Sequence, residues 1–461
     1  MLRIFTPEYC DREIRYVLDL VFKDFWGIEF TTATSGGDTF ILESANGNIH
    51  IPGTFFRKYN DTGLEASILP RSPLPEIAVN PVSGKGELPE SVPLLYGNEK
   101  PAVIHSSPQD YTLSIDIFGS VFFMLTRFEE YVYTQRDNHD RFPVTASLAY
   151  RNNFIDRPLV NEYLEILWSL LEYLNPGLRR SSRTFRVTPG HDIDVPFMAY
   201  RTGIIPFLRY FFSELNTRRR PDLIVPLLSG SLQAKRGDYR QDPFFTFDYI
   251  MKQSEKRDLQ SRFYLIADST GSPMDGTYAI DDPEITGLLG EIHKRGHEIA
   301  LHCSYESYRD GEKIRDEYRK LVSCCERLGI RQEIRIARQH YLRFSIADTW
   351  RLLDQAGIRY DESLTFAGSP GFRCGTCYEY PVFDLTNCRQ LDLIERPLIV
   401  MDSSVLLKRY IAAGQKAPDP DALVQLKNTC RKYNGTFNLL WHNNHLTGAK
   451  EREMYEAVLD A

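Results

Sequence analysis

Two aspartates with a spacing that suits catalysis stand near the middle of the chain, at Asp192 and Asp194. On an extended strand their side chains would share one face, and in a loop they could converge on one metal ion or one water molecule. His302 follows a separate apolar segment of the kind that forms a buried strand. Because carboxylates and imidazoles are common ligands of catalytic Zn²⁺, such a set could hold a metal ion.

The joint pattern along the chain is more informative than any single motif. Taken alone, an Asp-x-Asp pair or a lone histidine is more often an ordinary polar residue than a ligand. Here Arg338 and His340 follow a third apolar segment, and His442 follows a fourth. Together these residues could supply metal ligands, a general base, the partner that orients the base and a general acid.

The second half of the chain has the alternating rhythm that would position these residues. Four helical patterns end at a glycine and are followed by a short apolar strand; the glycines are Gly296, Gly329, Gly357 and Gly435. Glycine suits the left-handed position that ends a helix, and alternating helices and strands predict a parallel sheet. The polar residues follow the strands, which in a (β/α) barrel is the catalytic rim.

The first part of the chain has a different pattern, with short strand-like segments, turns and prolines followed by helices. We expect strands at 39–42 and 49–53, irregular chain over about 70–101, and helices over 115–133 and from Asp156 onward.

A turn and a polar run after these helices mark a candidate domain boundary, at Asn175-Pro176-Gly177 and residues 179–183. We predict an α/β chain with two domains. Residues 1–180 would form a smaller α+β domain of unknown role. Residues 181–461 would form a (β/α) barrel, distorted or seven-stranded, in line with the ~250 residues of such a barrel.

The composition limits the classes of partner. The chain has 461 residues, with 55 Lys or Arg and 62 Asp or Glu, and its net charge is −7. An acidic chain does not favour nucleic acid or an anionic membrane surface as a partner. No apolar run approaches the ~20 residues of a transmembrane helix, and the N-terminus lacks the pattern of a signal peptide. Since the eight cysteines show no disulfide spacing, we expect reduced thiols and a cytoplasmic location.

Five segments of the second half carry a resemblance to a known family. They are, in chain order, His191-Asp192-Ile193-Asp194-Val195-Pro196, Arg262-Phe263-Tyr264-Leu265, Gly296-His297-Glu298-Ile299-Ala300-Leu301-His302, Arg338-Gln339-His340-Tyr341 and Leu439-Leu440-Trp441-His442. This ordered set resembles the motifs of the polysaccharide deacetylase superfamily, the carbohydrate esterases with a NodB-homology domain. The resemblance covers about residues 186–461, and its specificity comes from the order of the five matches.

The resemblance implies a role for individual residues. In the family the first aspartate of the Asp-x-Asp motif is the general base, here Asp192, and the second binds the metal, here Asp194. His302 matches a metal-binding histidine. Arg338 matches the arginine that orients the base, and His442 matches the general acid.

One departure from the family pattern concerns the metal. The family has a second metal-binding histidine four residues after the first, where this chain has Glu306. Glutamate can still donate an oxygen to Zn²⁺ or to a harder divalent ion. We favour His340 as the third ligand beside Asp194 and His302, narrowly ahead of Glu306. Weak or lost metal binding is the third possibility.

Candidate substrate contacts lie beside these motifs, at Tyr341, Arg373 and Trp441. Arg373 belongs to a loop that could line the cleft and hold a charged or hydroxyl-rich substrate. The same loop contains Cys374-Gly375-Thr376-Cys377. Because the chain has no second Cys-x-x-Cys pair, we interpret these cysteines as reduced thiols and not as a zinc site.

The sequence thus predicts a metal-assisted hydrolase that removes acetyl groups from N-acetylated sugars of a polysaccharide or glycoconjugate, with Zn²⁺ as the favoured divalent metal. Two alternatives stay open: a catalytically inactive sugar-binding or assembly protein, and a hydrolase of other non-peptide C–N bonds. The N-terminal part, through residues 118–130 and 156–162, resembles an uncharacterised domain often fused to such deacetylases in bacterial exopolysaccharide loci. That resemblance implies no chemistry for the domain, and the sequence does not indicate an oligomeric state.

Overall fold

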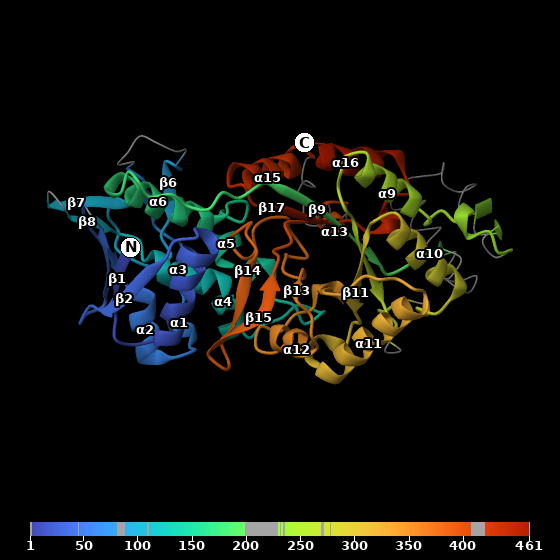
Figure 1. Cartoon of the computed structure of the whole chain (residues 1–461), viewed down its shortest axis with the longest axis horizontal. Helices are drawn as coiled ribbons and strands as arrows, with labels where there is room; N and C mark the ends of the chain where they lie inside the picture. The colour runs from blue at the N-terminus through green and yellow to red at the C-terminus, as the bar shows by residue number, and fades with distance from the viewer. Residues whose placement is uncertain are drawn as a thin grey trace.

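The structure is a computed structural model in which two parts of the chain lie side by side, the N-terminal part coloured blue to green and the C-terminal part green to red (Figure 1). The described residues are 2–44, 46–80, 88–107, 110–198, 229–230, 232–233, 236–268, 272–276, 278–406 and 420–460.

The N-terminal part is built on a mixed six-stranded sheet in the order β2-β1-β3-β4-β8-β7. The two strand-like segments of the sequence form an antiparallel hairpin of β3 (Thr39–Ser44) and β4 (Gly47–Pro52). Within its described residues, the stretch 70–101 contains only the short pair β5–β6. The other strands of this part are β1 (Leu2–Thr6), β2 (Phe30–Thr34), β5 (Glu76–Ala78), β6 (Ser91–Pro93), β7 (Val103–Ser107) and β8 (Asp110–Leu113).

Helix α3 (Ile117–Leu125) is the centre of this part, because it is buried along its whole length and contacts α1, α2 and α6. The single helix expected over 115–133 is in fact two, α3 and α4 (Phe128–Val132). Arg127 between them has a left-handed backbone (φ 52°), and its buried guanidinium pairs with Glu130 at 2.9 Å. The other helices are α1 (Asp11–Leu18), η1 (Asp19–Phe25), α2 (Thr54–Thr62), η2 (Ala66–Ile68), η3 (Val144–Ala146), α5 (Leu148–Arg151) and α6 (Leu159–Leu174).

The C-terminal part contains a nine-stranded sheet in the order β14-β15-β13-β12-β11-β10-β9-β17-β16. All neighbouring pairs are parallel except β14 and β15. The strands are β9 (Arg186–Ile193), β10 (Arg262–Ile266), β11 (Glu298–Cys303), β12 (Ile336–Gln339), β13 (Tyr360–Asp361), β14 (Tyr380–Asp384), β15 (Arg389–Glu395), β16 (Val400–Met401) and β17 (Thr436–Leu440).

The sheet is open and curled, so the distorted or seven-stranded (β/α) barrel expected from the sequence is met in part, as a half-barrel of nine strands. Among the described strands, the two edges β14 and β16 do not pair with each other. The parallel series stops at β15 because β14 turns back on it in an antiparallel hairpin. The α/β class and the parallel order of the central strands are as the sequence predicts.

Helices alternate with these strands, and three of the four predicted glycine ends are confirmed. Gly296, Gly329 and Gly357 have φ of 77°, 69° and 88°. After α15 the left-handed residue is Asn434 (φ 52°) and not Gly435, where a β-carbon would clash with the sulfur of Cys377. The helices are η6 (Tyr239–Gln241), α9 (Phe247–Glu255), α10 (Pro283–Lys294), η7 (Ser307–Arg309), α11 (Gly311–Arg327), η8 (His340–Leu342), α12 (Thr349–Gln355), α13 (Asp402–Leu406), α15 (Pro420–Lys432), η9 (Asn443–His445) and α16 (Ala449–Asp460).

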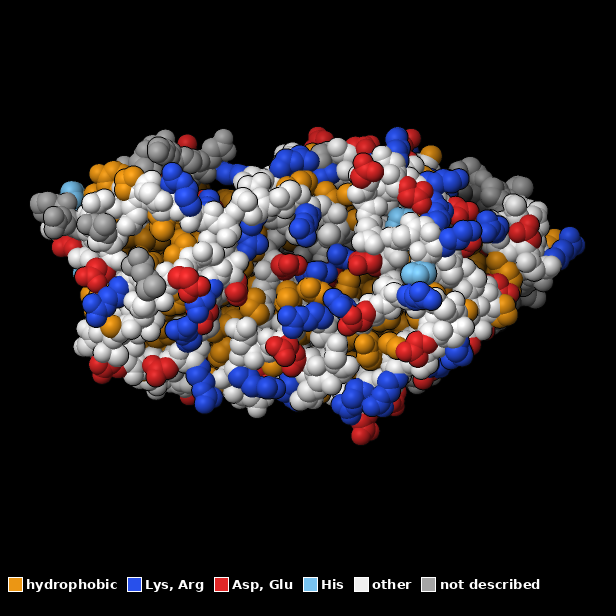
Figure 2. Space-filling model, in the orientation of Figure 1, with side chains coloured by type: hydrophobic (Ala, Val, Ile, Leu, Met, Phe, Trp, Pro, Cys, Tyr) orange, Lys and Arg blue, Asp and Glu red, His pale blue; other side chains and the backbone are white. Residues whose placement is uncertain are grey.

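One hydrophobic core runs through both parts of the chain. At the junction, the rings of Tyr16 and Phe383 lie 5.0 Å apart, and the Tyr16 hydroxyl donates to the carbonyl of Pro381 at 2.7 Å. On the face shown in Figure 2, acidic and basic side chains are interspersed and neither sign forms one continuous patch. None of the described helices combines the length and the apolar character needed to cross a bilayer.

Candidate active site

A cavity of about 570 Å³ lies at the carboxyl ends of the central strands. Strands β17, β9, β10, β11 and β12 are neighbours and parallel, so the residues that follow them meet at one edge of the sheet. A volume of this size is typical of a small-molecule site. The residues singled out in the sequence that line the cavity are Asp192, Asp194, His302, His340, Tyr341 and His442.

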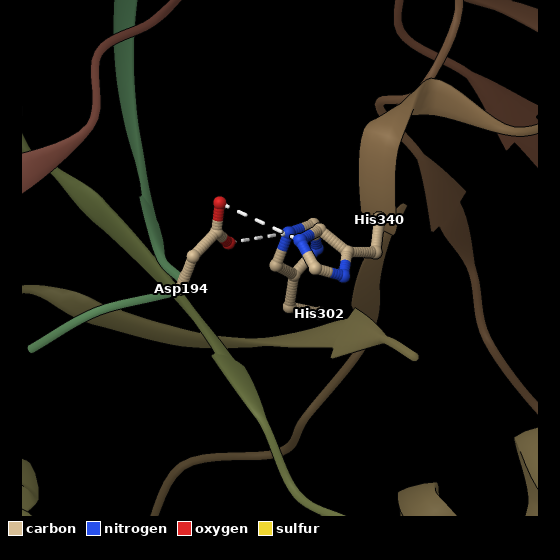
Figure 3. A group of neighbouring side chains, drawn as sticks. All are labelled: Asp194, His302 and His340. Carbon is tan, nitrogen blue, oxygen red and sulfur yellow. Dashed lines mark ion pairs between the residues drawn. The ribbon is translucent and has the colours of Figure 1, made fainter. Parts of the chain in front are cut away.

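The structure brings together the three residues favoured as metal ligands. One ligand atom each from Asp194, His302 and His340 lies within 4.8 Å of the others. Asp194 Oδ1 is 3.1 Å from His302 Nε2, and Asp194 Oδ2 is 3.5 Å from His340 Nε2 (Figure 3). Three protein ligands with room for a fourth are typical of catalytic zinc.

Hydrogen bonds to the far side of each ring orient the two imidazoles. His302 Nδ1 lies 2.9 Å from the backbone carbonyl oxygen of Arg338, and His340 Nδ1 lies 2.9 Å from Asp275 Oδ1. Since a carbonyl oxygen can only accept, His302 Nδ1 carries a hydrogen, and Nε2 is the nitrogen that a neutral ring would offer to a metal. His302 Nε2 and Asp194 Oδ1 are buried 3.1 Å from each other, and neither has another hydrogen-bond partner among the described residues. This donor set fits a divalent metal.

The charges around Asp194 favour its ionised form. Burial by itself would raise the pKa of Asp194, but the surrounding imidazoles outweigh burial and hold the pKa well below its usual range. Burial would likewise lower the pKa of His340, but the charges of Asp194 and Asp275 raise it to about 9. The site therefore attracts positive charge, whether a proton or a metal cation.

Asp275 is a site residue that the sequence analysis did not identify. It lies in the loop after β10 and is buried, and its Oδ1 also accepts a hydrogen bond from the backbone N–H of Tyr305 at 2.7 Å. The Asp275-Gly276 dipeptide signals only a turn. Its role beside His340 follows from the fold, which brings this loop to the end of β12.

Glu306, the alternative third ligand, points elsewhere. Its side chain is 48% exposed and pairs with Arg343, whose Nη1 is 3.2 Å from Glu306 Oε2. Glu306 does not line the cavity. The geometry therefore favours His340 over Glu306, while the ligand role itself stays a prediction.

Asp192 and Arg338 form a buried ion pair beside the metal candidates. Arg338 Nη1 donates to Asp192 Oδ1 at 2.6 Å, and Arg338 Nε donates to the backbone carbonyl of Glu362 at 2.8 Å. The Tyr264 ring lies 3.9 Å from the guanidinium. Burial would lower the pKa of Arg338, but the carboxylate of Asp192 raises it above its ordinary value. Arg338 thus holds one oxygen of Asp192 and leaves the other, which is 3.5 Å from His302 Nε2, toward the site.

His442 faces the same cavity from the end of β17 and is held by Asp402. Asp402 Oδ1 lies 2.8 Å from His442 Nδ1, and Asp402 Oδ2 lies 2.9 Å from His445 Nδ1. His442 Nε2 is 3.5 Å from Asp194 Oδ2. Burial would lower the pKa of His442, but the Asp402 charge raises it well above its usual range. This environment favours the protonated form of His442.

The structure places only one of the three predicted substrate contacts in the cavity. Tyr341 lines it and is 36% exposed. Arg373 is buried at the junction and pairs with Glu130, with Nε 2.9 Å from Oε1. Trp441 is fully buried against Tyr455, with ring centroids 5.4 Å apart. Neither Arg373 nor Trp441 lines the cavity, so the structure does not support the expectation that they contact substrate there.

Comparison with known proteins gives a family only for the N-terminal part. The sequence model of a family of unknown function (DUF7033) matches residues 2–176. No curated protein matches the chain. The pairing of such a domain with deacetylases in exopolysaccharide loci stays a prediction.

Two solved structures are similar to the chain at low identity. One, from Mycobacterium smegmatis, is described as a candidate polysaccharide deacetylase; it is 15% identical, with a TM-score of 0.39, covering 61% of this chain and 84% of that one. The other is a mutant of BA3943, described as a CE4 family pseudoenzyme with restored enzymatic activity. It is 10% identical, with a TM-score of 0.30, covering 61% of this chain and 62% of that one. At these identities, function has to be inferred from the residues of the site.

Proposed function

We propose that the protein is a metal-assisted hydrolase that removes acetyl groups from N-acetylated sugars of a polysaccharide or glycoconjugate. The observation that carries the proposal is the convergence of Asp194, His302 and His340 on one point of the cavity, where their ligand atoms lie within 4.8 Å of one another. Asp192, which pairs with Arg338, and His442, which pairs with Asp402, line the same cavity. This is the set of groups that hydrolysis of an acetamide requires.

Asp194, His302 and His340 would hold the metal, with Zn²⁺ as the favoured ion. When bound there, the metal would supply a Lewis acid for the acetamide carbonyl and lower the pKa of water. Asp275 and the Arg338 carbonyl keep the two rings turned toward Asp194. Such outer partners are a regular feature of metal sites because they fix the ring orientation.

Asp192 would act as the general base. Its Oδ1 is fixed by Arg338, so the other oxygen can take a proton from the attacking water. The water oxygen then adds to the carbonyl carbon of the acetamide. The buried guanidinium holds Asp192 in place before this step.

His442 would act as the general acid. The C–N bond of the tetrahedral adduct breaks as His442 donates its proton to the departing amine nitrogen, and acetate and the free amino sugar result. Asp402 orients the ring and favours its protonated form. A carboxylate for the base and an imidazole for the acid thus face the same cavity.

An apolar patch in the cavity supports acetyl as the group removed. Leu342, Met401 and Leu440 belong to one small hydrophobic cluster, with Ala367 packed against it, and all four line the cavity. An acetyl methyl group would be desolvated there at little cost, whereas a charged acyl group would not.

A catalytically inactive sugar-binding protein is the second candidate. It is favoured by Glu306 at the position where the resembled family has its second metal-binding histidine, since this carboxylate turns to Arg343. The position of His340, 3.5 Å from Asp194, supports the enzyme instead. A cytoplasmic location and an exopolysaccharide substrate stay predictions from the sequence.

Acetate release from N-acetylglucosamine oligomers tests the proposal. The protein is stripped with a chelator and assayed before and after Zn²⁺ is restored, with Asp192→Asn as the inactive control. We expect release only with metal and only from the wild-type protein. Tight oligomer binding without any acetate release would instead favour the inactive sugar-binding protein.

A further inference from the structure

A short segment of the N-terminal part reaches the cavity of the C-terminal part. His139 and Arg141, in the loop between α4 and η3, line the same cavity as Asp194 and His302. No sequence motif connects this loop with the strand ends. The fold alone brings it there, which raises the question of what the loop contributes.

The loop is built as an ordered turn around Asp137. Asp137 Oδ1 accepts hydrogen bonds from the backbone N–H of His139 at 2.8 Å and of Arg141 at 3.0 Å. Its Oδ2 accepts from Arg141 Nε at 2.8 Å. Burial would raise the pKa of Asp137, but these bonds from Arg141 lower it, so the carboxylate stays ionised. An aspartate that binds the backbone of the next residues is a common way to fix a tight turn.

The turn is also tied to the C-terminal part at several points. Arg343 Nε donates to the carbonyl of His139 at 3.0 Å, and His139 Nδ1 lies 2.9 Å from the Tyr305 hydroxyl. Asp140 pairs with Arg309 at 2.9 Å. Arg343 is the same residue that pairs with Glu306. The carboxylate at position 306 therefore supports the attachment of this turn.

The turn holds a strained residue at the mouth of the cavity. Tyr341 and Leu342 have φ of 58° and 56°, a left-handed conformation that persists only where the surroundings enforce it. Arg141 Nη1 donates to the carbonyl of Tyr341 at 3.0 Å. The His139 ring lies 4.8 Å from the Tyr341 ring, at an interplanar angle of 36°. Both contacts come from the N-terminal part.

We infer that His139 and Arg141 are positioning residues of the active site, which hold the Tyr341 ring in place as an aromatic contact surface for the sugar. Tyr341 is 36% exposed and its ring lies 4.8 Å from that of His340. A tyrosine face offers a sugar ring an apolar contact surface, with a polar edge for its hydroxyls. The inference rests on the proposed function, because it assigns the sugar to the cavity beside the metal residues.

The test compares Arg141→Met with Arg151→Met, a control on an exposed arginine of the same N-terminal part, outside the cavity. With an N-acetylglucosamine oligomer, Arg141→Met should raise KM about 3- to 10-fold, the effect of one lost hydrogen bond. kcat and the affinity for Zn²⁺ should not change, nor should any parameter of Arg151→Met. Dissociation constants for the oligomer, measured by calorimetry on the metal-free proteins, should shift by the same factor as KM.

A double-mutant cycle separates positioning from general damage. If Arg141 acts through Tyr341, then Arg141→Met should add nothing to the KM of a Tyr341→Ala variant. Full additivity, or an unchanged KM and dissociation constant in Arg141→Met, overturns the inference. If the wild-type protein binds the oligomer but releases no acetate, the proposed function fails, while weaker binding by Arg141→Met still supports the inference. A wild-type protein that neither binds nor hydrolyses the oligomer overturns both.

Discussion

Replacement of Arg338 by methionine removes the only cation that touches Asp192 within the described part of the chain. Arg338 is fully buried and Asp192 is 4% exposed at its side chain, with 2.6 Å between Arg338 Nη1 and Asp192 Oδ1. Methionine has a similar length but no charge, so Asp192 would be left buried and unpaired. Breaking a buried pair in this way costs about 3–5 kcal/mol. Glu362, the second partner of Arg338, keeps Arg262 at 2.7 Å, so most of the cost falls on Asp192.

Urea unfolding measures this cost, and a second substitution shows its origin. We expect the free energy of unfolding of Arg338→Met to fall by about 3–5 kcal/mol. Adding Asp192→Asn should restore part of the loss, because a neutral amide does not need a cation.

Two results would refute this reasoning. A loss of less than about 1 kcal/mol would mean that the pair behaves like an exposed surface pair. A double variant as unstable as Arg338→Met, or more so, would mean that the unpaired charge of Asp192 is not the cause. In either case Arg338 could not be the residue that holds the base in place.

Two further predictions follow from buried titratable groups. His442→Ala should lower kcat for acetate release by about 10²–10⁴, the usual contribution of one general acid, with an unchanged zinc content by atomic absorption; loss of zinc would make His442 a ligand. Burial raises the pKa of Glu317 to about 8, even though Ser304 donates a hydrogen bond to its carboxylate. The protonated Glu317 side chain therefore stabilises the fold below pH 4.5, and this stabilisation is lost as the pH rises through about 8. Urea unfolding of Glu317→Gln should therefore depend less on pH than that of the wild type between about pH 5 and pH 9, and parallel curves would contradict this.

Local patterns in the sequence were sufficient to predict the central strands and the candidate site residues at the ends of those strands. Apolar strands flanked by helix-ending glycines predict a parallel sheet, and Asp192, His302 and Arg338 stand at neighbouring strand ends in the structure. Such residues can be grouped without knowledge of distant contacts, because parallel strands present their carboxyl ends on one edge.

Features that depend on contacts between distant segments could not be predicted. From its own loop, Arg373 is predicted to be a cleft residue. In the structure its partner is Glu130, which lies 243 residues earlier in the chain. Trp441 directly follows Leu440, and successive side chains of an extended chain point to opposite sides. Only Leu440 lines the cavity, while Trp441 is buried away from it. The hairpin that keeps the sheet open depends on β14 pairing with β15, which the periodicity of either strand alone does not indicate.

The approach of the N-terminal part to the site also depends on contacts between distant segments and could not be predicted. His139 reaches the cavity through contacts with Tyr305 and Arg343, and neither its own neighbours in sequence nor the motifs of the second half indicate this. Asp275 shows the same limitation, since its bond to His340 joins two loops that follow different strands.

Titration of Zn²⁺ into the metal-free protein by calorimetry tests the central claim most directly. The wild-type chain should bind one ion at this site, and His302→Ala and His340→Ala should each lose it, because two remaining ligands rarely hold zinc tightly. Glu306→Gln is the matched control and should bind like the wild type, since Glu306 pairs with Arg343. Wild-type affinity in His302→Ala or His340→Ala, or loss of the ion in Glu306→Gln, would contradict the assignment of Asp194, His302 and His340 as the metal site.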